Sequence, residues 1–309
     1  MKYVQYVNSL IKENIKNKPK LVLFGQNINA GSSLSGLTRE LSLKDGGLII
    51  NTQNSENSLV GVGFGLMLNN ISSVFFMKQM DFLLLGIDQL VNTYNIVRQS
   101  NPKASFTVFP VIVDSGFEGP QSSLNNFDDF CSIAGVEGYS FTNKEDTEAI
   151  ISKHLIKPGF RILSTGQRLL RENTLELKVL QQDPDCKYFQ YKKGNDASIV
   201  CFNQTLSYGD SLSNYMSNKS ITSSLFSINS HLYTDYGFIF QDIKSTRKLI
   251  VIDDTKSRNR LSDRFLAHVI SSCDLKKYKV VSRNPNENDF FPNNDKLSID
   301  YENIIKDVI

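Results

Sequence analysis

The chain has 309 residues, of which 40% are hydrophobic and 21% charged, and its formal net charge at pH 7 is +2. So small a net charge excludes the strong field by which proteins bind nucleic acid or a membrane surface, and no segment approaches the roughly 20 apolar residues of a membrane-spanning helix. The length is sufficient for two domains of ordinary size.

The cysteines and the N-terminus indicate a reducing compartment. Cys131, Cys186, Cys201 and Cys273 are scattered, without the Cys-x-x-Cys spacing that is typical of zinc sites. The first residues lead into an amphipathic helix and lack the apolar core of a signal peptide. We therefore expect a cytoplasmic protein, because thiols stay reduced in that compartment.

Strands and helices alternate along the first half of the chain. Such alternation predicts a parallel sheet with helices on both of its faces. The expected helices are 6–15, 37–43, 56–68, 82–98, 127–133 and 145–154, and the expected strands are 21–24, 48–51, 75–77, 105–114, 136–141 and 160–164.

A polar, charged stretch at 171–194 interrupts this pattern, and a second alternation follows it. We expect strands at 198–202, 223–228, 249–253 and 278–281, and helices at 210–218, 238–245, 261–273 and 301–308. The predicted fold class is therefore α/β, with two doubly wound domains built on largely parallel sheets. We place the domains at residues 1–185 and 186–309.

The stretch 51–92 contains the most informative helix. Ser55 is a plausible N-cap, and Glu56 follows in the first turn, where the positive end of the helix dipole favours a carboxylate. The rest of this helix is apolar on every side, so we expect it to be buried. Gly61, Gly63 and Gly65 each cost a helix interior about 1 kcal/mol, which predicts that another backbone packs very close to them.

Two other interpretations of this stretch were weighed. A glutamate in a first helical turn is most often only a partner of the helix dipole. The glycines could also form a dinucleotide-binding loop, with Asp81 downstream, but that loop must directly follow a strand. Here residues 52–60 separate the glycines from the strand, so the dinucleotide interpretation is rejected.

Several motifs in this stretch carry a family resemblance. They are Ser55-Glu56-Asn57, the glycine-spaced helix, Phe75-Phe76-Met77, Phe82 and Ile87-Asp88-Gln89-Leu90-Val91-Asn92. Together they resemble the pyrimidine-binding domain of thiamine-diphosphate enzymes in the transketolase superfamily, and best the β subunit of the heteromeric 2-oxo-acid dehydrogenase E1 component. The order of elements in the second half resembles the transketolase C-terminal domain.

The resemblance implies roles for named residues. Glu56 would be the catalytic carboxylate that activates the cofactor by sharing a proton with its aminopyrimidine ring. Asn54, Glu56 and Phe82 would bind thiamine diphosphate, with Phe82 beneath the pyrimidine ring. Lys78, Gln121 and Ser122 would face the substrate, a small keto compound.

The resemblance also implies a partner chain. Members of the superfamily hold the cofactor's diphosphate and Mg²⁺ through a Gly-Asp-Gly signature, and neither Gly209-Asp210-Ser211 nor Asp45-Gly46-Gly47 fits it. We expect an α-type subunit to carry that site, most simply in an α2β2 assembly. This chain itself is expected to supply no metal ligand.

Four departures from the E1 β pattern concern the substrate side. Gln26 and Asn27 stand where that family has acidic residues, and Lys78 where it usually has an apolar one. In the segment 119–123, Ser122 replaces the family's histidine, and the polar segment 253–260 replaces a glycine-rich turn. The basic residues of 253–260 suggest either contact with a phosphorylated substrate or a solvated loop.

These observations leave two functions open. The first is a catalytic β-type subunit that cleaves or forms a C–C bond beside a carbonyl, by 2-oxo-acid decarboxylation or dehydrogenation or by transketolase-like transfer. The second is a degenerate, non-catalytic subunit that stabilises or regulates its partner. Glu56 favours the first, and the missing histidine favours the second.

Overall fold

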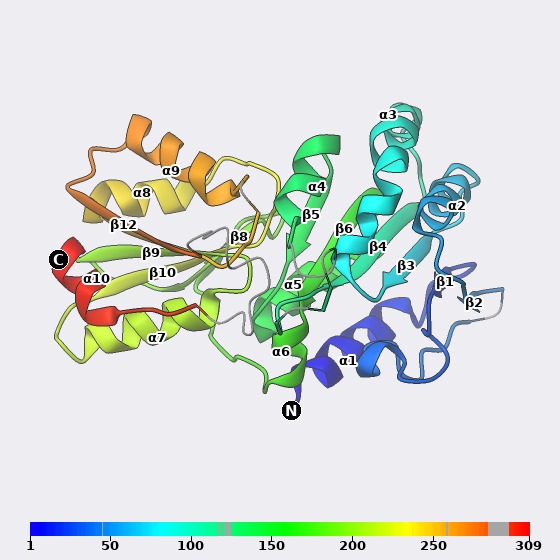
Figure 1. The fold of residues 1–309 in the computed structure, drawn as a ribbon, viewed down its shortest axis with the longest axis horizontal. Coiled ribbons are helices and arrows are strands. Elements are labelled where there is room, and N and C mark those ends of the chain that lie inside the picture. Colours follow the sequence, from blue (N-terminus) through cyan, green and yellow to red (C-terminus); the bar gives the residue numbers. More distant parts are fainter. Residues whose placement is uncertain (45, 117, 120, 122–124, 258, 284–296) are drawn as a thin grey trace.

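The computed structural model describes residues 1–44, 46–116, 118–119, 121, 125–257, 259–283 and 297–309. Within them the strands form two six-stranded sheets, which lie side by side in Figure 1. The predicted fold class, α/β with two largely parallel sheets, is confirmed.

Strand directions differ slightly between the two sheets. All neighbouring strands of the first sheet are parallel, in the order β2 (Leu48–Asn51), β1 (Val22–Gly25), β3 (Ser73–Met77), β4 (Ser105–Ile112), β6 (Gly159–Gly166) and β5 (Glu137–Ser140). The second sheet has the order β12 (Lys277–Ser282), β11 (Lys248–Asp253), β9 (Ala197–Phe202), β10 (Ser223–Ile228), β8 (Tyr188–Lys192) and β7 (Gln181–Gln182). In it β8 is antiparallel to both neighbours and the other pairs are parallel. The domain boundary after residue 185 stays a prediction.

Helices cover both faces of each sheet (Figure 1). On the first sheet, α2 (Glu56–Leu68), α3 (Tyr94–Val97) and α4 (Phe127–Ala134) lie on one face, and α1 (Tyr3–Ile15) and α5 (Lys144–His154) on the other. On the second sheet, α8 (Gly237–Thr246) and α9 (Leu261–Ser272) lie opposite α7 (Leu206–Ser217) and α10 (Tyr301–Val308). The short α6 (Gln167–Arg171) follows β6.

The central strands explain why the sequence forms this fold. Every residue of β3 and of β4 is buried, as parallel strands are when helices cover both faces of their sheet. One buried apolar cluster continues along a single side of both sheets, and it contains Leu163 of β6 and Ile199 of β9. The two halves of the chain therefore share part of their core.

Three segments differ from the expectations. Residues 37–43 were predicted as a helix, but the structure has a short 3-10 helix, η1 (Leu34–Gly36), followed by turns, and both Leu34 and Glu40 have positive φ. Residues 82–98 are helical, but as η2 (Met80–Gly86, 3-10), η3 (Gln89–Thr93, π) and α3. Strand β8 lies in the polar stretch where the sequence predicts a domain boundary. Its antiparallel pairing with β10 involves residues that are distant in the sequence, so the local pattern does not predict this strand.

The expectations for α2 were half right. Val60, Phe64 and Met67 are buried against the sheet, but Val62 and Leu68 are each 50% exposed. Among the described residues, side chains and not another backbone lie nearest to these glycines: a Cβ on Gly63 would meet the ring of Phe106 at 2.1 Å, whereas a Cβ on Gly65 would have no atom within 4 Å outside its own helix. One face of α2 is therefore tightly packed and the other is open.

This difference gives a matched pair of stability predictions. Gly63→Ala forces a methyl group into the Phe106 ring and should lower the free energy of unfolding by about 1–3 kcal/mol. Gly65→Ala enters open space and should raise it by about 0.5–1 kcal/mol, because alanine favours a helix. Urea denaturation of the isolated chain measures both values. Equal effects of the two substitutions would contradict the packing described here.

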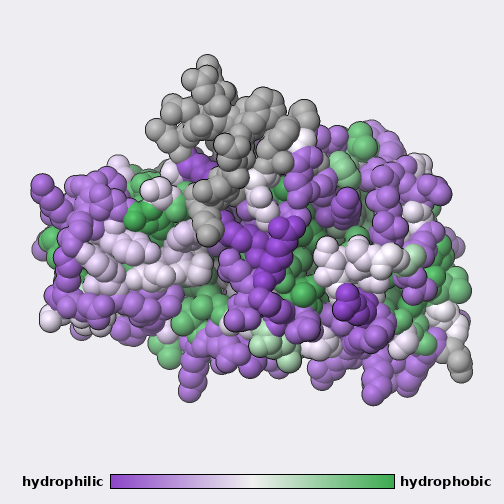
Figure 2. Space-filling view, turned by 60° about the horizontal axis from the view of Figure 1, so that its bottom comes forward, coloured by the Kyte–Doolittle hydropathy of each residue, from purple (hydrophilic) through white to green (hydrophobic). Residues whose placement is uncertain are grey.

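The surface is largely hydrophilic on the face that Figure 2 shows, with hydrophobic side chains in separate patches. One patch lies at the right-hand end, where the β1–β2 edge of the first sheet lies in Figure 1. On the edge strand β2, Leu48 is 56% and Ile50 43% exposed. No helix among the described residues is both long and apolar enough to cross a membrane.

Candidate functional site

A narrow pocket lies at the carboxyl ends of three neighbouring strands of the first sheet, β2, β1 and β3. Its volume is about 10 Å³, which is enough for about one water molecule. Open α/β sheets bind their ligands at this edge. The lining residues are Gln26, Gln53, Asn54, Glu56, Leu59, Phe75, Phe76, Met77, Lys78 and Phe82.

Close backbone packing shapes the floor of the pocket. Gly25, the last residue of β1, has a φ of +147°, and a Cβ on it would lie 2.1 Å from the carbonyl oxygen of Phe76. Glycine alone has no Cβ to clash at that distance. Phe75 is held from beneath, because its ring stacks on Phe24 at a centroid distance of 5.0 Å.

Glu56 is the acidic residue of the pocket. It is the first residue of α2, and it is only 8% exposed. Ser55 occupies the N-cap position, as predicted, but its hydroxyl donates to Ser58 Oγ at 3.0 Å and does not cap the helix. The Glu56 carboxylate receives no hydrogen bond from any residue that the structure describes. A carboxylate that lines a pocket and has no donor of its own can accept a hydrogen bond from a ligand.

The helix behind Glu56 holds it in place. Val60 lies one turn further along α2. A Cβ on Gly86 of η2 would be 3.0 Å from the side chain of Val60 and 3.5 Å from the carbonyl oxygen of Glu56. Gln89 of η3 donates to Asn57 Oδ1 at 2.8 Å. The α2 N-terminus is therefore packed against η2 and η3 and cannot shift independently of them.

Phe82 and Lys78 reach the same pocket from the chain after β3. Phe82 lies on η2, half-buried against the apolar cluster under α2. Lys78 directly follows β3 and is exposed, and it forms no ion pair with a residue in the described ranges. Its charge is therefore available at the mouth of the pocket.

Of the other predicted site residues, the structure describes Asn54 and Gln121. Asn54 lines the pocket and is exposed. Gln121 does not line it, but its Nε2 donates to the carbonyl oxygen of Asp81, next to Phe82, at 3.2 Å. Ser122 lies outside the described residues. The structure thus brings together Asn54, Glu56, Lys78 and Phe82, with Gln121 beside them.

Sequence reasoning missed other residues near the pocket. Gln53 lines it, and its place two residues after β2 was the signal that could have revealed it. Gln79, which follows Lys78, donates to Glu118 at 2.8 Å, and Glu118 also accepts from Gln167 at 2.8 Å. These two hydrogen bonds join residues that are 39 and 49 positions apart in the sequence, so no local pattern could predict them.

The histidines lie elsewhere in the chain. His154 is fully buried, and burial lowers its pKa to about 4. His231 is held by Asp128, and His268 contacts Tyr233. None of the three lines the pocket as described. Among the described lining residues, Glu56 and Lys78 are therefore the side chains that carry an ionisable group.

Comparisons with known proteins agree on one group. Over 258 residues the chain is 23% identical to the pyruvate dehydrogenase E1 component subunit beta of Staurastrum punctulatum, covering 79% of this chain and 76% of that protein. It is 21% identical to the chloroplastic subunit beta-3 of Arabidopsis thaliana, but spans only 61% of that relative's length. A solved structure described as a split gene transketolase, inactive beta4 tetramer, superposes with a TM-score of 0.65 at 13% identity, covering 91% of this chain and 88% of that one.

The predicted resemblance to the transketolase and E1 β-subunit superfamily is confirmed. No protein-family model matches the chain. Within this transketolase-like fold, the pocket is built by the first sheet and the N-terminus of α2. No group of three or more histidine, cysteine, aspartate or glutamate side chains that could hold a metal ion occurs among the described residues.

Proposed function

We propose that the chain is the β-type subunit of a heteromeric thiamine-diphosphate enzyme that cleaves or forms a C–C bond beside the carbonyl of a small keto compound. The observation that carries this proposal is Glu56, a largely buried residue whose carboxylate has no donor among the described residues and lines a pocket that also contains the aromatic side chain of Phe82. Both are what an aminopyrimidine ring requires. The similarity to E1 β subunits supports the same cofactor.

The types of residue at the pocket, and not its volume of about 10 Å³, match one half of thiamine diphosphate. Glu56 would hold a proton against a ring nitrogen of the aminopyrimidine, Phe82 would pack on the ring, and Asn54 would contact its edge. When bound, the cofactor supplies a thiazolium carbanion that adds to a carbonyl group. The described lining offers one carboxylate and one cation, so the diphosphate and Mg²⁺ are assigned to the partner chain.

The open face of α2 supports the existence of such a partner. Val62 and Leu68 on α2, and Leu84 and Leu85 on η2, are 39–55% exposed. Exposed apolar side chains that gather on one face mark protein interaction sites, and Gly65 leaves room for close approach. We propose an α-type subunit that carries the diphosphate site, in an α2β2 complex.

The free, buried cysteines accord with the cytoplasmic location that we predict.

The substrate side of the pocket favours an anion. Its mouth carries the charge of Lys78 and the neutral amides of Gln26, Gln53 and Asn54. A 2-oxo-acid carboxylate or a sugar phosphate would neutralise Lys78, and Gln121 and Ser122 are proposed to complete the contact. The absence of histidine from the described lining favours the rival function, a degenerate subunit that only stabilises or regulates its partner.

The division of the site between two chains gives a binding prediction. The isolated chain should not bind thiamine diphosphate with Mg²⁺ at micromolar concentration, because it lacks the diphosphate site. Titration calorimetry of the isolated chain, with the reconstituted complex as the control, measures this. Micromolar, magnesium-dependent binding to the isolated chain would contradict the split site.

A further inference from the structure

Two of the four departures from the E1 β pattern lie in loops whose described residues are in contact with each other. One is the 113–126 segment, between β4 and α4, which contains Gln121. The other is the 254–260 loop, between β11 and α9, of which the structure describes every residue except 258. They belong to different sheets, and their sequences lie more than 120 residues apart. Their contacts are therefore a property of the fold.

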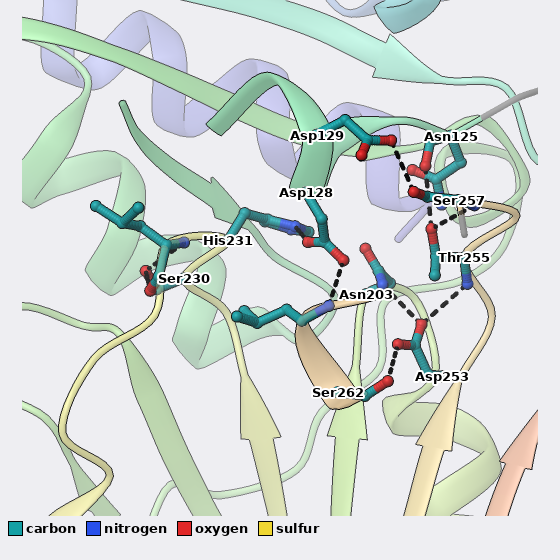
Figure 3. Close-up of polar contacts among 12 residues, drawn as sticks. Asn125, Asp128, Asp129, Asn203, Ser230, His231, Asp253, Thr255, Ser257 and Ser262 are labelled. Atoms are coloured by element: carbon teal, nitrogen blue, oxygen red, sulfur yellow. Dashed lines mark hydrogen bonds and ion pairs between the residues drawn. The ribbon is translucent and has the colours of Figure 1, made fainter. Parts of the chain in front are cut away.

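The end of the 113–126 segment is bound directly by the loop. Thr255 Oγ1 donates to the carbonyl oxygen of Asn125 at 3.0 Å (Figure 3). Just beyond, Asp129 of α4 accepts hydrogen bonds from Ser257 Oγ at 2.7 Å and from Asn259 Nδ2 at 2.9 Å. These contacts hold the chain at the point where α4 begins.

The first turn of α4 is also bound by the residue that follows the loop. Asp128, 5% exposed, accepts from the backbone N–H of Leu261 at 3.0 Å, so it caps the N-terminus of α9 from the other sheet (Figure 3). Its second oxygen contacts Nδ1 of the buried His231 at 2.7 Å. A carboxylate at a helix N-terminus is stabilised by the helix dipole. Because Asp128 keeps its contacts with Leu261 and His231, removal of a single contact between α4 and the 254–260 loop should leave α4 folded.

The start of the segment is bound to the loop through an arginine. The backbone N–H of Arg168 donates to Asp114 Oδ1 at 2.7 Å. Its guanidinium group lies 3.8 Å from Asp114 Oδ2 and 3.4 Å from Asp254 Oδ2. All three side chains are at most 12% exposed, so solvent screens these charges little.

Between these two ends, the segment reaches the candidate pocket. Gln121 donates to the carbonyl oxygen of Asp81, and Glu118 accepts from Gln79, the residue after Lys78. We propose that the 254–260 loop is a positioning element of the candidate site: through Asp254 and Thr255 it holds Asp114 and Asn125 of the 113–126 segment, through Ser257 it holds the first turn of α4, and it thereby sets how Gln121 meets the substrate. The substrate part of this statement rests on the function proposed above.

The test compares two changes of the same chemistry in the full chain. Thr255→Val combined with Ser257→Ala removes the two hydroxyl donors to the segment and to α4. Thr246→Val is the control, because Thr246 is also buried but its hydroxyl bonds Ser198, which joins the end of α8 to β9. Amide hydrogen exchange, read by mass spectrometry, is measured in peptides that cover residues 113–129.

We expect exchange in residues 113–129 to become about tenfold faster in the double variant, because lost hydrogen bonds favour local opening. In the control it should stay within about twofold of the wild-type rate. Ser257→Ala alone, which leaves Asp129 bonded to Asn259, should give a smaller acceleration and guards against misfolding of the double variant. Unchanged exchange in both variants would overturn the proposal.

A second measurement distinguishes a failure of this proposal from a failure of the proposed function. In the reconstituted complex, the double variant should raise KM for the keto substrate and leave the affinity for thiamine diphosphate unchanged. Equal losses in substrate and cofactor binding would overturn the positioning role. Faster exchange together with a wild-type complex that lacks turnover would contradict the proposed function but not the hold of the loop on the segment.

Discussion

Substitution of Glu56 by glutamine should lower the turnover of the reconstituted complex by about 10²–10⁴-fold, the range in which positioned proton transfer contributes to catalysis. Glutamine keeps the size and shape of the side chain but cannot hold the proton. Because Glu56 receives no hydrogen bond from the described residues, the substitution should leave the fold and the subunit assembly intact. Steady-state kinetics and gel filtration of the complex measure both expectations.

A glutamate that serves only the helix dipole would behave differently. Such a residue contributes about 0.3–1 kcal/mol to stability and nothing to turnover. Glu302 provides the matched control, since it lies in the first turn of α10, is exposed, and is remote from the pocket. Glu302→Gln should leave turnover unchanged. If Glu56→Gln matched Glu302→Gln in turnover, Glu56 would be a dipole partner and no more.

Substitution of Lys78 by methionine should lower kcat/KM for an anionic keto substrate by about tenfold to a hundredfold, mainly through KM. That range corresponds to a lost charge-assisted hydrogen bond of about 1.5–3 kcal/mol. The affinity for thiamine diphosphate should remain nearly intact, because the proposed cofactor contacts of Asn54, Glu56 and Phe82 are unchanged. Initial-rate kinetics and calorimetry on the same complex separate the two effects.

Lys103 offers the control for Lys78. It is also exposed, but it precedes β4 and so lies at the amino end of the parallel sheet, opposite the pocket. Lys103→Met should have wild-type kinetics. Wild-type kinetics in Lys78→Met as well, with every accepted donor, would remove Lys78 from the substrate site.

The fold could be predicted where local pattern and tertiary packing agree. Strands β3 and β4 are mostly apolar and lack a strict polar–apolar alternation, so the sequence indicates that helices cover both faces of the first sheet. The prediction failed for residues 37–43, where positive φ at Glu40 ends any helix. It also failed for β8, because that strand lies in a polar stretch and pairs with β10 in the opposite direction.

The candidate site could be predicted as far as strand ends determine it. Glu56 and Lys78 follow β2 and β3, whose carboxyl ends lie at the same edge of the sheet, so their convergence follows from the alternation of elements. The bridge from Gln79 through Glu118 to Gln167 does not follow from it. Such contacts depend on how loops from distant parts of the chain pack, which no periodicity encodes.

We propose that Glu56 activates thiamine diphosphate in a site shared with a partner chain. The most direct test of this proposal is the rate at which the thiazolium C2 proton of the bound cofactor exchanges with deuterium, measured by quenched-flow NMR on the reconstituted complex. We expect this exchange to be fast in the wild-type complex and slower by orders of magnitude in Glu56→Gln, in parallel with turnover. The same exchange rate in both complexes would contradict the account.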